Sequence, residues 1–177
     1  MPKLVKEKIR NIPNFPKEGI IFRDITTLLQ DSDGLGRVTE ILVNRYKEAD
    51  IDVVAGIEAR GFIIGGIVAH QLGKGFVPLR KSGKLPYKTI EHEYELEYGT
   101  DKIEIHIDSL KKGDKVLLID DLLATGGTGL AGAKLVEKLG GKIVELAFIV
   151  DLPEVGGREK IKQAGYKVFS ICEFEGE

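Results

Sequence analysis

VLLIDDLLATGGT, residues 116–128, is the stretch from which the fold class follows. Its first four residues, 116–119, are all apolar, which is typical of a strand buried on both faces of a parallel sheet. Two adjacent carboxylates, Asp120 and Asp121, come next. A loop of small residues, 124–128, then precedes a helical pattern that continues to Leu139. This order predicts a ligand site at the carboxyl end of the strand.

The loop and the acids suit the two halves of a phosphorylated sugar. A small-residue loop at a helix N-terminus presents backbone N–H groups and the positive end of the helix dipole to an anion, most naturally a phosphate. The hydroxyls of Thr125 and Thr128 add two donors. Asp120 and Asp121 can accept hydrogen bonds from a vicinal diol. A ribose that carries a 5-phosphate meets both requirements.

The same stretch closely resembles the 5-phosphoribosyl 1-pyrophosphate (PRPP) binding signature of the type I phosphoribosyltransferases. That signature is a hydrophobic strand, two acids and a loop of the ATGGT kind. The resemblance implies that Asp120 and Asp121 face the ribose hydroxyls. It also implies that five residues bind the 5-phosphate of PRPP or AMP: Ala124, Thr125, Gly126, Gly127 and Thr128.

Two alternatives fit part of this stretch. One is an ordinary glycine-rich strand–helix turn with surface acids. The other is a dinucleotide fingerprint, because Gly127, Gly129 and Gly132 have GxGxxG spacing and Asp151 follows at about the right interval. Six residues separate Asp120 from Gly127, however, whereas the first glycine of a dinucleotide turn directly follows its strand. That alternative also leaves the two acids without a role at the ligand.

Composition is that of an ordinary globular protein. The 177 residues suffice for one domain with a core, so we expect a single domain over residues 1–177. A net charge of −2 gives no general attraction to nucleic acid or to an anionic membrane. No apolar stretch approaches the ~18 residues of a membrane span. The single cysteine, Cys172, cannot form an internal disulfide, and we expect it to be buried in a cytoplasmic protein.

The rest of the chain alternates strands and helices. We expect helices at residues 3–10, 33–47, 62–72, 129–139 and 158–164, and strands at residues 51–57, 76–79, 103–107, 116–119, 143–150 and 168–171. Residues 90–98 permit a hairpin strand or a mobile flap. The pattern predicts an α/β fold with a mostly parallel sheet of about five strands flanked by helices. The resemblance implies the type I phosphoribosyltransferase fold, with residues 1–30 as a small N-terminal hood over the base site.

Two further strand ends carry candidate pyrophosphate ligands. The residues after strand 51–57 resemble the family's pyrophosphate loop, in which a non-proline cis peptide, here Glu58–Ala59 by position, presents backbone N–H groups. The run RKSGKLP, residues 80–86, resembles a segment of the adenine phosphoribosyltransferases whose cations face pyrophosphate, partly across a dimer interface. Taken alone, these segments would be a plain turn and a solvated charge run. The resemblance implies a pyrophosphate site made of Glu58, Ala59, Arg60, Arg80, Lys81 and Lys84.

The resemblance places base recognition at the two ends of the chain. PKEGIIFRD, residues 16–24, resembles the adenine-specific hood, which implies that Phe22 stacks on the purine while the backbone of Ile21 and Arg23 reads its edge. Leu152 matches the second apolar wall of the base site. Glu97, in a Leu-Glu-Tyr-Gly element, matches the catalytic loop near the purine. Without the resemblance, Phe22 and Leu152 would be core residues and Glu97 would face solvent.

The resemblance covers nearly the whole chain and implies an adenine phosphoribosyltransferase, which converts adenine and PRPP into AMP and pyrophosphate. We expect Mg²⁺ to ride on PRPP, because it keeps waters and phosphate oxygens as ligands. We expect no metal site in the protein itself, since His92 and its neighbouring glutamates lack further ligands at a recognisable spacing. Adenine and PRPP would be the partners of a homodimer that binds neither nucleic acid nor membrane. A nucleotide-sensing transcriptional regulator on the same fold is the alternative, which the slightly acidic charge disfavours.

Overall fold

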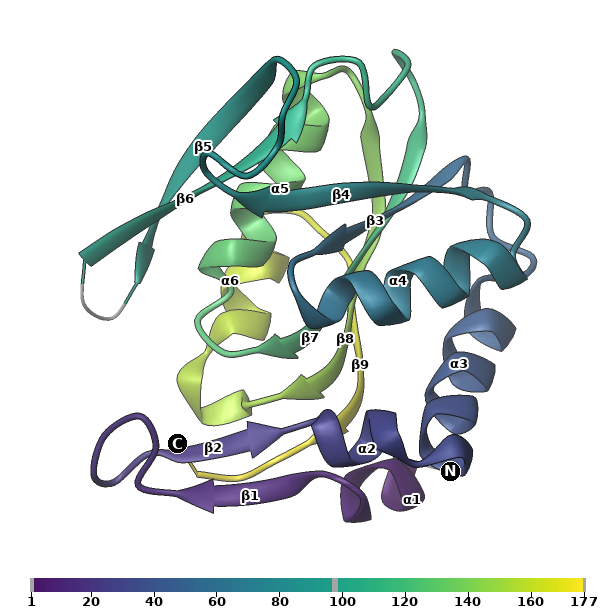
Figure 1. The fold of residues 1–177 in the computed structure, drawn as a ribbon. Coiled ribbons are helices and arrows are strands. Elements are labelled where there is room, and N and C mark those ends of the chain that lie inside the picture. Colours follow the sequence, from purple (N-terminus) through teal and green to yellow (C-terminus); the bar gives the residue numbers. More distant parts are fainter. Residues whose placement is uncertain (1, 97–98, 177) are drawn as a thin grey trace.

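The computed structural model describes residues 2–96 and 99–176. Its centre is a seven-stranded sheet in the order β5-β6-β4-β3-β7-β8-β9 (Figure 1). The strands are β3 (Val53–Ile57), β4 (Gly75–Lys81), β5 (Thr89–Leu96), β6 (Gly99–His106), β7 (Lys115–Leu123), β8 (Lys142–Asp151) and β9 (Val168–Glu173). Five of them, β4, β3, β7, β8 and β9, are parallel neighbours, which confirms the predicted sheet. The strands β5 and β6 add an antiparallel edge.

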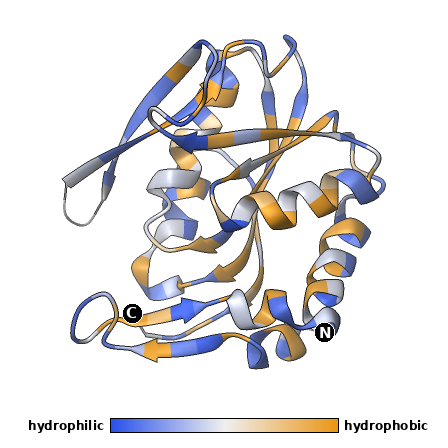
Figure 2. Cartoon of the chain, viewed as in Figure 1, coloured by the Kyte–Doolittle hydropathy of each residue, from blue (hydrophilic) through white to orange (hydrophobic). Residues whose placement is uncertain are grey.

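Helices cover both faces of this sheet. They are α1 (Pro2–Glu7), α2 (Thr26–Gln30), α3 (Ser32–Tyr46), α4 (Arg60–Gln71), α5 (Gly127–Lys138), α6 (Gly157–Gln163) and a short 3-10 helix η1 (Pro153–Val155). Alternate residues of β7 face different helices: Leu117 belongs to the core shared with α3 and α4, and Leu118 to the core shared with α5 and α6. The hydrophobic colouring accordingly concentrates along the central strands (Figure 2).

The N-terminal arm differs from the prediction. The helix expected at residues 3–10 ends at Glu7, and β1 (Arg10–Pro13) pairs antiparallel with β2 (Ile21–Asp24). A proline disfavours helical geometry at the residue before it, so the chain ahead of Pro13 is extended. Arg10 also holds the strand pair together, because its Nη2 donates to Asp24 Oδ2 at 2.6 Å. The arm lies beyond the carboxyl ends of the parallel strands (Figure 1).

The predicted end of strand 116–119 was also wrong. The strand β7 continues through both acids to Leu123, because Asp120, Leu122 and Leu123 pair with β8. The charges broke the apolar pattern, although the backbone ladder does not depend on side-chain polarity. For the same reason β6 begins at Gly99, earlier than predicted, within a charged segment. Residues 89–96 form the hairpin strand that the sequence permitted.

Candidate active site

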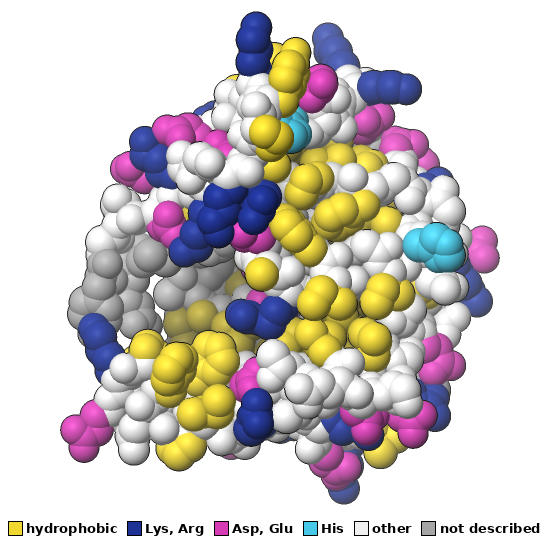
Figure 3. Space-filling view, viewed as in Figure 1, with side chains coloured by type: hydrophobic (Ala, Val, Ile, Leu, Met, Phe, Trp, Pro, Cys, Tyr) yellow, Lys and Arg dark blue, Asp and Glu magenta, His cyan; other side chains and the backbone are white. Residues whose placement is uncertain are grey.

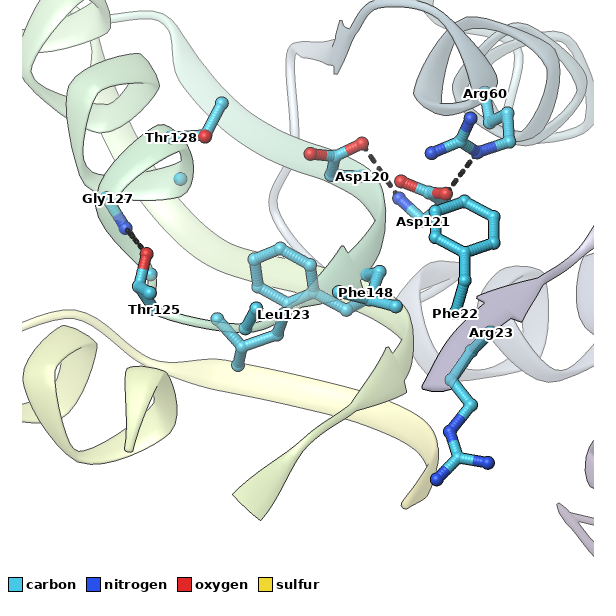
Figure 4. Close-up of a pocket in the computed structure, with 14 residues that line it drawn as sticks. Phe22, Arg23, Arg60, Asp120, Asp121, Leu123, Thr125, Gly127, Thr128 and Phe148 are labelled. Carbon is cyan, nitrogen blue, oxygen red and sulfur yellow. Dashed lines mark hydrogen bonds and ion pairs between the residues drawn. The ribbon is translucent and has the colours of Figure 1, made fainter. Parts of the chain in front are cut away.

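A cavity of about 470 Å³ lies between the arm and the carboxyl end of β7. The space-filling view shows the molecule hollowed at this position (Figure 3). The cavity brings together residues that β2, α4, β7, α5 and β8 contribute. They are Phe22, Arg23, Arg60, Asp120, Asp121, Leu122, Leu123, Ala124, Thr125, Gly126, Gly127, Thr128, Gly129 and Phe148. Phe22, Leu123 and Phe148 form its apolar part, and the loop 124–128 lies opposite Arg60 (Figure 4).

A second cavity of about 250 Å³ adjoins the first. The two share Arg60, Asp120, Asp121 and Thr128. The remaining lining residues of the second cavity are Ile57, Glu58, Lys81, Tyr94, Asp101 and Ile103. The two acids therefore stand at the junction of an aromatic and glycine-rich cavity with one that is rich in charge.

The two acids have different hydrogen-bond partners. Asp121 accepts a hydrogen bond from Arg60 Nε, and its own backbone N–H donates to Asp120 Oδ1 at 2.8 Å. Burial, and then the nearby Asp121, raise the pKa of Asp120 well above its ordinary value. Burial alone would lower the pKa of Arg60, but the acids around it raise the pKa overall. Asp121 is thus paired with a cation, and both carboxyls line the cavity, where their oxygens can accept hydrogen bonds from sugar hydroxyls.

The loop 124–128 has the geometry of an anion-binding turn. Gly126 has a φ of +78°, a left-handed conformation that glycine adopts without strain. The helix α5 begins at Gly127, and no side chain caps it. The first N–H groups of a helix have no partners within the helix, so this end is suited to a phosphate. The hydroxyl of Thr125 lies 3.4 Å from the Gly127 nitrogen.

Arg80, Lys84 and the backbone of Lys81 bond Glu58, whereas the Lys81 ammonium pairs with Asp101 and Arg60 pairs with Asp121. The Glu58–Ala59 peptide is cis, as expected. The Glu58 carboxylate accepts the Lys81 backbone N–H at 2.5 Å, and its Oε2 lies 3.2 Å from Arg80 Nη2 and 3.0 Å from Lys84 Nζ. Burial opposes ionisation of Glu58, yet these donors lower the pKa of the carboxyl. A single buried anion therefore holds cations that the sequence associated with a polyphosphate.

A second carboxylate shapes the same basic segment and was not predicted. Glu104 on β6 is 4% exposed and accepts the backbone N–H groups of Lys84 and Leu85 at 2.9 and 2.8 Å. Burial disfavours its charge, but these N–H donors lower the pKa of the carboxyl. The loop that carries Lys84 is thus anchored from both sides, by Glu104 and by Glu58. The sequence indicated Glu104 only as a glutamate among the apolar residues of the predicted strand 103–107.

Arg23 turns its side chain away from the first cavity (Figure 4). Its Nη1 donates to Asn11 Oδ1 at 2.8 Å, and its Nη2 donates to the backbone oxygen of Glu175 at 2.9 Å. Burial lowers the pKa of this guanidinium. The Arg23 guanidinium is therefore held by Asn11 and Glu175, and recognition of the base by the Arg23 backbone stays a prediction. Phe22 contacts Phe15 edge-on, with ring centroids 5.3 Å apart.

Some predicted residues lie outside both cavity linings. Leu152 is 9% exposed and packs in the core, while Leu123 and Phe148 take the apolar positions beside the loop. The sequence did not indicate Leu123 as a cavity residue, because the predicted strand ended at residue 119 and β7 continues to Leu123. Neither cavity is lined by Ile21, Ala59, Arg80 or Lys84. Arg80 and Lys84 form ion pairs with Glu58, which lines the second cavity. Glu97 lies outside the described residues.

Neither a metal-binding cluster of side chains nor a membrane-spanning helix occurs in the part of the chain that the structure describes. No group of three or more His, Cys, Asp or Glu side chains there is arranged to hold a metal ion. His92 instead lies 3.2 Å from Lys138 Nζ through its Nδ1. None of the helices there is both long and apolar enough to cross a membrane. Cys172 is free and buried, and burial raises the pKa of its thiol to about 11.

Comparison with known proteins agrees with this geometry. The phosphoribosyl transferase domain family matches residues 24–175. The adenine phosphoribosyltransferase of Chlorobium luteolum is 63% identical over 175 residues, which are 98% of this chain and 99% of that protein. The crystal structure of the Thermoanaerobacter pseudethanolicus adenine phosphoribosyltransferase superimposes with a TM-score of 0.94 at 47% identity, over 98% of this chain and 100% of that one.

A ligand-bound structure is also similar. The Saccharomyces cerevisiae adenine phosphoribosyltransferase, crystallised with adenine and an imino-altritol bisphosphate, is 35% identical with a TM-score of 0.89. The match covers 97% of this chain and 98% of that one. The chain therefore belongs to the phosphoribosyltransferase family, among the adenine phosphoribosyltransferases.

Proposed function

We propose that this chain transfers the 5-phosphoribosyl group from PRPP to adenine, giving AMP and pyrophosphate. The observation that carries the proposal is the junction of the two cavities at Asp120 and Asp121. A phosphate loop and an aromatic side chain lie in one cavity, and a basic cluster borders the other. PRPP has a phosphate and a pyrophosphate at opposite ends of one ribose, so it spans this arrangement with the ribose at the acids.

The first cavity takes the sugar phosphate and the base. Ala124, Thr125, Gly126, Gly127 and Thr128 bind the 5-phosphate through backbone N–H groups and hydroxyls. Phe22 stacks on adenine, and the apolar side chains of Leu123 and Phe148 lie across the same cavity. The backbone of Ile21 and Arg23 supplies an acceptor for the exocyclic amine and a donor for the ring nitrogen. The resemblance assigns a second apolar wall of the base site to Leu152, which is 9% exposed and lies outside the cavity lining.

The second cavity takes the leaving group. The backbone of the Glu58–Ala59 peptide and the side chains of Arg60, Arg80, Lys81 and Lys84 bind pyrophosphate. Positive charge develops at the anomeric carbon as the bond to pyrophosphate breaks, so the protein has to stabilise that charge and the departing anion together. The Asp120–Asp121 pair lies on the ribose side for the first task, and the cations serve the second. Glu97 approaches the adenine proton that is lost.

The donor set at the junction fits Mg²⁺ that arrives with the substrate. Mg²⁺ prefers hard oxygen ligands and retains several waters, so one or two carboxylates suffice when phosphate oxygens complete the shell. Asp120 is such a carboxyl, whereas Asp121 is already paired with Arg60. When bound, the ion would neutralise charge on the pyrophosphate. The protein residues hold the substrate that carries it and do not form a cage.

The proposal extends to the assembly and location. We propose a cytoplasmic homodimer in which residues 1–177 are one domain and residues 1–30 contribute the base site. The basic segment at residues 80–86 supports a dimer through its resemblance to the adenine phosphoribosyltransferases, in which the cations of this segment face pyrophosphate partly across a dimer interface. Sedimentation analysis of the purified chain tests the dimer, and a monomer at micromolar concentration would contradict it.

Turnover by the purified chain tests the reaction. Adenine, PRPP and Mg²⁺ are expected to give AMP and pyrophosphate in equal amounts. A parallel sample without adenine separates transfer from plain hydrolysis of PRPP. Pyrophosphate release that does not depend on adenine, or no turnover at all, would contradict the proposal.

A further inference from the structure

The chain segment that follows β8 donates backbone hydrogen bonds to the residues where β7 meets the loop 124–128, here called the phosphate loop. The Leu152 N–H donates to the Leu123 carbonyl at 3.0 Å, and the Gly157 N–H donates to the Ala124 carbonyl at 3.0 Å. Gly157 is buried and begins α6. Gly157 has no role in the reaction proposed above, yet two backbone groups of its segment bond the residues where β7 becomes the loop.

The contact at Gly157 is between two backbones, with no room for a side chain. A Cβ on residue 157 would lie 2.2 Å from the Ala124 oxygen and 2.7 Å from the Gly126 nitrogen. From the opposite side, a Cβ on residue 126 would lie 2.9 Å from the Gly157 oxygen. Ordinary van der Waals contact of a Cβ begins at 3.4 Å. A single methyl group at residue 157 would therefore displace the loop by about 1 Å, or push α6 away from it.

Arg158 prevents α6 from moving away. Its Nε donates to Asp151 Oδ2 at 2.5 Å, and its Nη2 donates to Glu173 Oε1 at 3.0 Å and to Ser170 Oγ. Asp151 is fully buried, and its Oδ1 has no hydrogen-bond partner among the described residues. A buried carboxylate is costly without a partner, so the Arg158 contact is strongly favoured. The residue next to Gly157 is thus tied to the ends of both β8 and β9.

We propose that Gly157 is a positioning residue for the sugar phosphate, and that Arg158 holds it in place. Gly157 fixes the turn 124–126 from behind, so the N–H groups of the loop converge on one anion. A displacement of about 1 Å weakens all these contacts together. A misplacement of this size can lower the rate of an enzyme reaction about 100-fold. This inference rests on the proposed assignment of the loop to the 5-phosphate.

The test compares Gly157→Ala with Gly66→Ala. Gly66 lies in α4, where a Cβ would meet no atom within 4 Å, so it controls for a helical glycine replaced by alanine. Calorimetry measures ribose 5-phosphate, which probes the loop, and pyrophosphate with Mg²⁺, which probes the second cavity. Gly157→Ala should raise the dissociation constant for ribose 5-phosphate by at least about tenfold. The dissociation constant for pyrophosphate should change by less than about twofold in both variants. In the control, the dissociation constant for ribose 5-phosphate should also change by less than about twofold.

A second variant keeps the inference testable where Gly157→Ala does not fold. Arg158→Lys retains the positive charge near Asp151, but one ammonium cannot replace the planar guanidinium at three acceptors. Arg158→Lys should weaken the binding of ribose 5-phosphate but not that of pyrophosphate, and the loss should be smaller than in Gly157→Ala. Equal affinities of wild type and folded variants for ribose 5-phosphate would overturn the inference alone. A wild type that binds pyrophosphate but no ribose 5-phosphate would overturn the loop assignment, and the inference with it.

Discussion

Removing the charge of the Glu58 carboxylate should lower the stability of the protein but strengthen its binding of pyrophosphate. Glu58 Oε2 lies 3.2 Å from Arg80 Nη2 and 3.0 Å from Lys84 Nζ, the cations proposed to bind pyrophosphate. Pyrophosphate must therefore draw them away from Glu58. Glu58→Gln keeps the shape and can still accept the Lys81 N–H, but it removes the competing charge. The free protein should become less stable, and pyrophosphate should bind more tightly.

The exposure of the cations sets the magnitude. The Glu58 side chain is 8% exposed, but those of Arg80 and Lys84 are 34% and 47% exposed. Partly exposed pairs contribute about 0.2–1 kcal/mol each, so we expect a loss of about 0.5–2 kcal/mol in the free energy of unfolding. The same free energy no longer opposes pyrophosphate, which corresponds to about 2- to 30-fold tighter binding. Salt screens such charges, so the gain should shrink as ionic strength rises.

Urea denaturation and calorimetric titration with pyrophosphate and Mg²⁺ measure the two quantities. Glu91→Gln is a matched control, because Glu91 pairs with Lys102 at 2.8 Å on the β5–β6 hairpin and lines neither cavity. It should leave pyrophosphate affinity unchanged. Weaker pyrophosphate binding in Glu58→Gln would refute the reasoning, because the carboxylate would then be part of the bound site and not a competitor.

Three further predictions concern the arm, the loop and the basic segment. Hydrogen bonds from Arg10, and then from Thr26, lower the pKa of Asp24 from 3.8 to about 2. The stability that this gives is complete above pH 4 or so and is lost as pH falls toward about 2, so Asp24→Asn should flatten urea denaturation midpoints across that window; parallel pH profiles for both proteins would contradict this. Gly127→Val should abolish PRPP binding in a folded protein, because a side chain at residue 127 would occupy the approach of the phosphate in a loop where a Cβ already lies 3.0 Å from the Glu95 carbonyl, and unchanged affinity by calorimetry would refute it. Arg80→Ala should raise the PRPP requirement and weaken pyrophosphate inhibition more than adenine use; kinetic constants all within about twofold of wild type would show an ordinary surface charge.

The parallel sheet could be predicted because its strands are buried on both faces and read as continuous apolar runs. The strand end at Asp120 could not, because an apolar pattern cannot register a backbone ladder that continues under charged residues. The loop 124–128 could be identified because its glycines are typical of backbone conformations that few other residue types adopt. Gly126 shows why, since its left-handed φ of +78° is disfavoured for other residues.

Long-range partners account for most of what the sequence did not reveal. Glu58 and Lys84 are 26 positions apart, and no local spacing predicts that one anchors the other. Phe148 lies in an apolar strand like its neighbours, and only the sheet register places it beside the loop. Gly157 is one of 22 glycines, and its contact with Ala124 depends on how β8 and α6 return to β7.

The measurement that tests the central claim most directly is the ranking of purines. Wild type and Arg23→Ala would compete adenine against hypoxanthine and guanine, with PRPP and Mg²⁺ at fixed concentration. A base with the opposite donor–acceptor pattern leaves backbone groups unpaired, at a cost of about 1–3 kcal/mol, so adenine should rank first in wild type. Because the Arg23 side chain bonds Asn11 and turns from the cavity, the variant should keep that order. Hypoxanthine as the preferred base in wild type, or an inverted order in Arg23→Ala, would contradict recognition of adenine by the hood backbone.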